Sequence, residues 1–91
     1  MSKVILKGFI LVPQPELAAI KNELVNHKRL TLKEEGCLLF EVTQSRDNRC
    51  RFDVHEEFVD KCSFEHHQAR VRSSYWGKLT VNVERHYQIF E

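Results

Sequence analysis

The sequence predicts one α+β domain with the element order β-α-β-β-α-β and a four-stranded antiparallel sheet. Four short apolar stretches carry the β-branched and aromatic residues typical of strands. Two longer stretches with apolar residues at helical spacing lie after the first and third of them. The 91 residues, 42% hydrophobic and 30% charged, suit one small domain with a modest core. We therefore expect residues 1–91 to form a single domain.

The first strand is predicted over Lys3–Val12, an apolar run that ends at Pro13 because proline cannot donate to a sheet ladder. Apolar side chains point to both faces of this strand, so we expect both faces to be buried. Pro15 suits the first turn of a helix, which is predicted over Pro15–Lys33. The apolar stripe of that helix consists of Leu17, Ile20, Leu24 and His27.

A hairpin is predicted next, with strands over Cys37–Ser45 and Arg51–Val59. Gly36 ends the preceding helix, and Ser45–Asn48 has the composition of a turn. Asp60 or Ser63 could cap the second helix. Its stripe is predicted to contain Phe64, His67, Val71, Tyr75 and Leu79.

Gly77 weakens the end of the second helix, and a fourth strand is predicted over Thr80–Phe90. One side of this strand should carry Val81, Val83, Arg85, Tyr87 and Ile89. The resulting order is the ferredoxin-like pattern, in which both helices cover one face of the sheet and leave the other open.

The open face of the predicted sheet is too apolar to be solvated. We expect the helices to meet Val4, Leu6, Ile10, Phe52, Val54 and Phe58. The opposite face then carries Ile5, Phe9, Leu11 and Leu39. A second subunit that presses its own sheet against this face would cover it, so we expect a homodimer.

Composition excludes several classes of partner. A net charge of +1 gives no basic surface for nucleic acid or an anionic membrane. No apolar stretch approaches the roughly 20 residues of a membrane helix, and no small-residue cleavage site follows the first apolar run, so we expect a cytoplasmic protein. The three cysteines lack the close spacing of a metal site, and we expect reduced thiols and no metal.

The third strand places a carboxylate among large apolar side chains, because Glu56 shares a face with Phe52, Val54 and Phe58. His67 lies in the apolar stripe of the second helix, which should cross that same face. The two side chains should therefore meet and could exchange protons near neutral pH. A purely structural pair, or a histidine turned to solvent, remains the alternative.

Two further positions are candidates for ligand contact. Arg72 could hold an anionic or enolic oxygen, or could be a solvated helix charge. Tyr75 and Trp76 could wall a pocket for a planar ligand, or could be core residues. No nucleophile elbow, phosphate-binding glycine loop or zinc spacing is present in the sequence.

Three motifs resemble the antibiotic biosynthesis monooxygenase family. They are E-E-G-C-L-L-F-E-V-T-Q at Glu34–Gln44, R-F-x-x-x-E-x-F at Arg51–Phe58 and F-x-x-H at Phe64–His67. The resemblance implies a dimeric α/β barrel that binds a compact organic substrate between sheet and helices. It also implies oxidation of quinols or aromatic compounds by dioxygen without metal, flavin or other cofactor. By motif, Glu56 matches the strand glutamate and His67 the helix histidine of the family.

The resemblance gives the following hypothesis: a cofactor-independent monooxygenase for a small quinol-like substrate. His67 is the base, Glu56 orients it and Arg72 stabilises an oxyanion. The expected substrate contacts are Phe40, Phe58, Phe64 and Trp76.

Departures from the family pattern leave other functions open. Many relatives have a second histidine where this chain has Arg72. Haem degradation is disfavoured because Lys3–Val12 lacks the asparagine that the haem-degrading branch uses. An isomerase of a small phosphorylated carbonyl compound, or a binding module without catalysis, are the alternatives.

Overall fold

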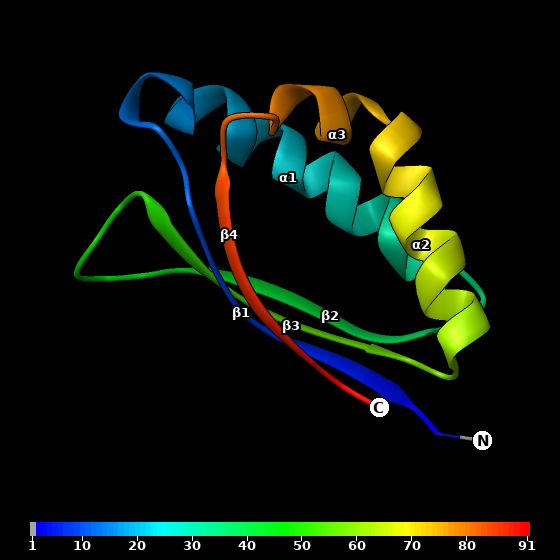
Figure 1. Ribbon diagram of the computed structural model, residues 1–91. Coiled ribbons are helices and arrows are strands. Elements are labelled where there is room, and N and C mark those ends of the chain that lie inside the picture. The colour runs from blue at the N-terminus through cyan, green and yellow to red at the C-terminus, as the bar shows by residue number, and fades with distance from the viewer. Residues whose placement is uncertain (1) are drawn as a thin grey trace.

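The computed structural model describes residues 2–91. The chain forms a curved antiparallel sheet with all helices on one face (Figure 1). The strands are β1 (Val4–Leu11), β2 (Cys37–Gln44), β3 (Arg51–Phe58) and β4 (Glu84–Phe90). They lie in the order β2-β3-β1-β4, and the sheet does not close. The helices are a 3-10 turn η1 (Gln14–Glu16), α1 (Leu17–Leu32), α2 (Lys61–Ser73) and a short α3 (Tyr75–Leu79). The predicted ferredoxin-like order is confirmed.

The core lies between the sheet and the helices, as the strand alternation predicts. All six side chains expected to face the helices are buried: Val4, Leu6, Ile10, Phe52, Val54 and Phe58. From α1 the core receives Leu17 and Ile20, two members of the predicted stripe. Burial of large apolar side chains at these positions is the main stabilising contribution to a domain of this size.

A β-bulge in β2 sets the register next to Glu56. Cys37 pairs with Phe58 whereas Leu39 pairs with Glu57, so Leu38 is an extra residue and is exposed. Beyond the bulge, the buried Phe40 lies opposite Glu56. The bulge therefore places an aromatic ring beside the carboxylate on the helix-covered face.

The second helix begins as predicted but ends earlier. The Asp60 side chain accepts the backbone N–H of Ser63 at 2.8 Å, which settles the choice of cap. The helix stops at Ser73, because Ser74 adopts extended backbone and its hydroxyl accepts the N–H of Gly77 at 3.1 Å to start α3. Tyr75, predicted in the buried stripe, is 63% exposed, and Trp76 is buried instead.

The fourth strand begins later than predicted, at Glu84 rather than Thr80. The guanidinium of Arg85 donates to the carbonyls of Thr80 and Val83 and to the hydroxyl of Thr80, which holds these residues in a turn. Of the residues predicted to share one side of this strand, Val83 is buried and Tyr87 is half-buried, whereas Val81 and Ile89 are exposed.

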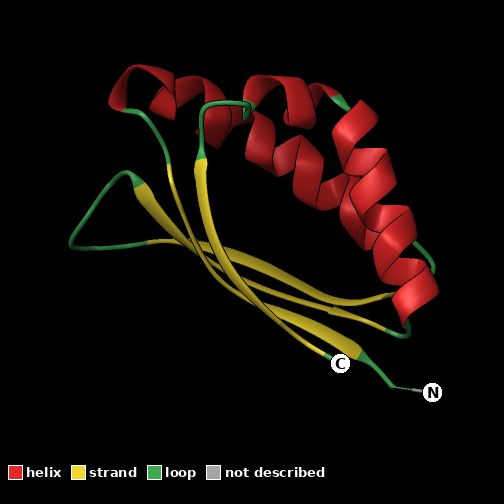
Figure 2. Cartoon of the chain, viewed as in Figure 1, coloured by secondary structure: helices red, strands yellow, loops and turns green. Residues whose placement is uncertain are grey.

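The helix-free face of the sheet carries the apolar side chains expected there, and it is open in the cartoon (Figure 2). Ile5, Phe9, Leu11 and Leu39 are all half-buried. The Phe9 ring stacks on His86 at 4.7 Å and lies 3.9 Å below the guanidinium of Arg51. Within residues 2–91 no helix combines the length and apolar character needed to cross a membrane.

Candidate functional site

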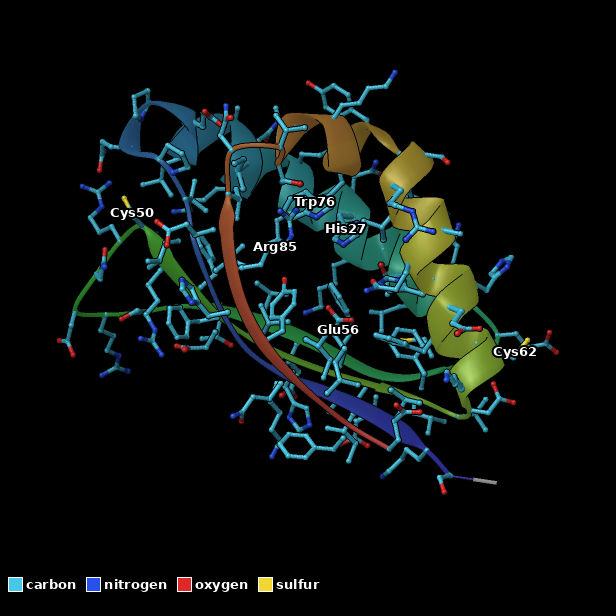
Figure 3. The ribbon with its side chains drawn as sticks, viewed as in Figure 1. His27, Cys50, Glu56, Cys62, Trp76 and Arg85 are labelled. Carbon is cyan, nitrogen blue, oxygen red and sulfur yellow. The ribbon has the colours of Figure 1, made fainter. Side chains whose placement is uncertain are left out.

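A cavity of about 400 Å³ lies between the sheet and the helices, a size typical of small-molecule sites. Aromatic rings of Phe40 and Trp76 form part of its wall. Its ionisable lining side chains are His27, Glu56, His67, Arg72, Arg85 and Tyr87. Figure 3 shows His27, Glu56, Trp76 and Arg85 gathered in the space enclosed by β4, α1 and the sheet.

A hydrogen-bonded carboxylate fixes the orientation of His67. Its Nδ1 lies 3.1 Å from both carboxylate oxygens of Glu34. Arg70, three residues along α2, donates its Nε to the same carboxylate and its Nη2 to the hydroxyl of Thr31 at 3.0 Å. An ionised carboxylate can only accept hydrogen bonds, so Nδ1 of His67 carries the proton that points at Glu34. The lone pair on Nε2 of the same ring is therefore free.

Glu56 lies on the Nε2 side of the same imidazole. Its Oε1 is 3.6 Å from Nε2 of His67, which is too long for a hydrogen bond. The residue is 7% exposed, and Oε1 has no hydrogen-bond partner in the described part of the chain. The predicted meeting of Glu56 and His67 is present, but the partner that orients the imidazole is Glu34 rather than Glu56.

The environment raises the pKa of Glu56 and lowers that of His67, which favours proton exchange at this site. Burial raises the pKa of Glu56 from 4.5 to about 7, and the negative charge of Glu34 adds to this effect. Burial lowers the pKa of His67 below 6.5, although the hydrogen bond and charge of Glu34 oppose the shift. At neutral pH His67 is therefore neutral, and Glu56 is close to half-protonated. Such a pair can accept and return a proton.

A second buried histidine, His27 of α1, belongs to the same cavity. Its ring stacks on Trp76 with centroids 4.5 Å apart and planes 4° apart, and it meets Phe40 edge-on at 5.4 Å. It is 4% exposed, and Nδ1 has no hydrogen-bond partner among residues 2–91. Burial, with smaller effects of His67 and Arg70, lowers the pKa of His27 to about 3. His27 is thus a neutral polar group at the end of the cavity where Trp76 lies.

The structure divides the other predicted site residues into two groups. Phe40, Arg72 and Trp76 line the cavity. Phe58 and Phe64 are outside its lining: Phe58 packs against the His67 ring at 4.8 Å and against Phe64 at 5.6 Å. Phe58 thus supports the imidazole from outside the cavity, and Phe64 supports Phe58.

Four groups of the site were not predicted from the sequence as site residues: His27, Glu34, Arg70 and Arg85. The signal for His27 was available, because it stood in an apolar stripe as His67 did. Tyr87 also lines the cavity, and burial, followed by the charge of Glu56, raises its pKa to about 12. In the part of the chain that the structure describes, no cluster of three or more His, Cys, Asp or Glu side chains is arranged to hold a metal.

Comparison with known proteins gives a family and a shared fold. Residues 4–76 match the profile of a family described as antibiotic biosynthesis monooxygenase. No curated protein matches the sequence.

Several solved structures have the same fold. A conserved protein of unknown function from Bacteroides thetaiotaomicron superposes with a TM-score of 0.83 and 23% identity over 99% of this chain and 97% of that chain. A candidate antibiotic biosynthesis monooxygenase from Deinococcus radiodurans gives 0.81 and 23% identity over 97% and 90% of the two chains. A variant of SnoaB, a cofactor-independent oxygenase from Streptomyces nogalater, gives 0.80 and 12% identity over 100% and 93%. At these identities the likeness shows the fold alone.

Proposed function

Because the chain belongs to the antibiotic biosynthesis monooxygenase family, we propose that it is a cofactor-independent monooxygenase that oxidises a small quinol-like or aromatic substrate with dioxygen. One observation supports this proposal most directly. His67 is a neutral imidazole held by Glu34, and its free Nε2 lies beside Glu56 at the wall of a cavity of about 400 Å³. This arrangement suits removal of a proton from a bound hydroxyl group.

In the proposed reaction, the substrate hydroxyl lies against Nε2 of His67, which takes its proton. Glu34 accepts from Nδ1 and stabilises the imidazolium that forms, in the way that a carboxylate supports a catalytic histidine in a triad. The ionised Glu56, 3.6 Å from Nε2, adds a second negative charge. Since a protonated Glu56 would instead donate to Nε2 and block it, the reaction requires Glu56 in its ionised form.

Proton removal leaves an electron-rich phenolate, which transfers one electron to dioxygen. The resulting superoxide recombines with the ring radical at a carbon that bears hydrogen, and the peroxide anion that forms takes back the proton held by His67 to give a hydroperoxide. Loss of water then yields a quinone, so one oxygen atom enters the product and the other leaves as water. We assign Arg72 to the phenolate oxygen, and Phe40 and Trp76 to contacts with the ring.

Oxygen uptake with a panel of quinols tests the proposal, with labelled dioxygen to follow one atom into the product. His67→Ala should lower the rate at least about 100-fold, the usual contribution of a general base. His66→Ala is the matched control, because this neighbour on α2 is exposed and should retain the activity. Unchanged uptake in His67→Ala, or consumption of oxygen without label in the product, would contradict the assignment.

Isomerisation of a small phosphorylated carbonyl compound is the second candidate, because it needs the same base and could use Arg72 for the phosphate. Isomerisation consumes no oxygen, so turnover without oxygen uptake would favour it. Tight binding without turnover would instead indicate a binding module.

A further inference from the structure

Two arginines from different elements line the cavity, Arg72 from α2 and Arg85 from β4. Neither forms an ion pair with a carboxylate within residues 2–91. The two histidines in the lining are neutral at physiological pH, and Glu56 is only partly ionised. The lining therefore carries an excess of positive charge, which favours an anionic ligand.

Arg85 is held in place by a network of hydrogen bonds. Its Nη1 donates to the carbonyls of Thr80 at 3.2 Å and Val83 at 3.3 Å, and its Nη2 donates to the Thr80 hydroxyl at 2.8 Å. Thr80 is fully buried, and its hydroxyl donates in turn to the carbonyl of Trp76 at 2.7 Å. Two of the five N–H groups of Arg85 remain after these three bonds, and the Tyr87 hydroxyl is a further hydrogen-bonding neighbour that shares them with a ligand. All three acceptors that fix it are uncharged, and its positive charge is not neutralised.

A fixed guanidinium of this kind is suited to recognition of a carboxylate or phosphate. Most arginines lose side-chain freedom when they bind an anion, and this loss weakens binding. Arg85 has already lost that freedom in forming its bonds to Thr80 and Val83. Arg72 has no such bonds among the described residues, so of the two arginines Arg85 is the one prepared for a permanent charge.

The sheet register separates Arg85 from the proton-transfer pair. Arg85 lies opposite Ile10 on β1, whereas Glu56 lies opposite Leu6 on the other side of the same strand. Two strand spacings of about 4.8 Å and four residues of about 3.3 Å place the two Cα atoms about 16 Å apart. Figure 3 shows both side chains in the space between sheet and helices. The cavity thus has a reactive end at Glu56 and a cationic end at Arg85.

We propose that the substrate is an elongated aromatic or enolic acid, whose permanent carboxylate or phosphate is bound by Arg85 while its hydroxyl reaches His67. The placement of the hydroxyl rests on the proposed function, whereas the anion site does not. Trp76, whose backbone carbonyl belongs to the network that holds Arg85, lines the cavity between the helices and β4.

Binding measured without turnover tests the anion site. Trp76 is the single tryptophan of the chain and lines the cavity, so its fluorescence reports occupancy directly. The probes are a quinol with a propanoate side chain, the amide of that compound and the corresponding quinol with a phosphate ester side chain, titrated under nitrogen. The wild-type protein should bind the better of the two anionic probes at least about tenfold more tightly than the amide. The two anions distinguish carboxylate from phosphate.

The variants separate the charge of Arg85 from its structural bonds. In Arg85→Gln the preference for the anion over the amide should fall to about one, while Arg85→Lys should keep part of it. Arg46→Gln is the matched control, because this exposed arginine lies in the hairpin turn and should keep the full preference. A ratio of affinities is used because a general loosening of the fold weakens both probes alike.

Equal affinity for amide and anions in the wild type, a preference retained in Arg85→Gln, or no binding of either anion at about 5 mM would each overturn the proposal. The result is independent of oxygen chemistry. An anion preference without oxygen uptake would refute only the proposed monooxygenase function. Rapid oxygen uptake with neutral quinols and no anion preference would refute only the anion site.

Discussion

Replacing Glu56 with glutamine should stabilise the protein at alkaline pH and change its stability little at acid pH. Burial raises the pKa of Glu56 from 4.5 to about 7, so the folded protein binds this proton more tightly than the unfolded chain does. The free energy of unfolding therefore decreases as the pH rises from 4.5 to about 7. Each pH unit in this interval corresponds to about 1.4 kcal/mol, which gives a total cost of about 3 kcal/mol. Glutamine has a similar size and no charge, and it avoids this cost.

Urea denaturation of both proteins at pH values of about 4 and about 8.5 measures the effect. The gain in unfolding free energy of Glu56→Gln should be larger at the higher pH by up to about 3 kcal/mol. Comparing the two pH values removes any effect of the amide that does not depend on pH.

Glu57→Gln is the control, since Glu57 is the next residue along β3 and faces the other side of the sheet. A hydrogen bond from Lys3, followed by the charge of Lys3 and the contact with His55, lowers the pKa of Glu57. Its ionised form is therefore favoured by folding, and its substitution should lower stability above pH 4.5. A gain in Glu56→Gln of the same size at both pH values would refute the argument that the buried charge is costly.

Three further predictions follow from the geometry. Glu34→Gln should lower kcat at least about tenfold with little change in KM, because the His67 imidazolium loses its charged partner. Oxygen uptake as a function of pH measures this effect. The control is Glu35→Gln, which changes an exposed neighbour and should leave kcat unaffected. His27→Phe should make the free energy of unfolding less sensitive to acid. In the unfolded chain the His27 ring is protonated below pH 6.5, but in the folded protein only near pH 3. Between pH 7 and 4 the wild type should therefore lose about 3 kcal/mol more unfolding free energy than the variant, measured in urea titrations. The wild-type protein should sediment as a homodimer and Phe9→Glu as a monomer, because the substitution puts a charge on the open face of the sheet. A monomeric wild type would contradict the dimer expected from the sequence.

Strand alternation is a local property, and this is why the sheet could be predicted from the sequence. Each inward side chain of β1 and β3 followed from its parity, and the packing agrees. The end of α2 could not be predicted in this way. There the hydroxyl of Ser74 takes the backbone N–H of Gly77 that a continuous helix would bond to a carbonyl, and the helix breaks. Helical spacing continued past this break predicts that Tyr75 is buried, whereas the structure buries Trp76.

The buried ionisable groups of the site could be predicted where polar residues stand on apolar faces. Glu56 and His67 met this criterion, and His27 met it as well. Glu34 lies just after the last turn of α1, where periodicity no longer indicates direction. Alternation placed Arg85 on one side of its strand with Tyr87, but not its hydrogen bonds to the turn before β4. Their contacts depend on the path of the chain between elements, so a sequence pattern could not reveal them.

The break between α2 and α3 at Ser74 separates the residues that form the two ends of the cavity. His67 and Arg70 belong to α2, and both bind Glu34 before the break is reached. Trp76 and the turn that holds Arg85 belong to the short stretch after it. We therefore expect substitutions, insertions or deletions in that stretch to alter the shape and charge of the far end of the cavity while the contact between His67 and Glu34 is kept. In related chains with this architecture, a change in ligand preference should then trace to one short segment.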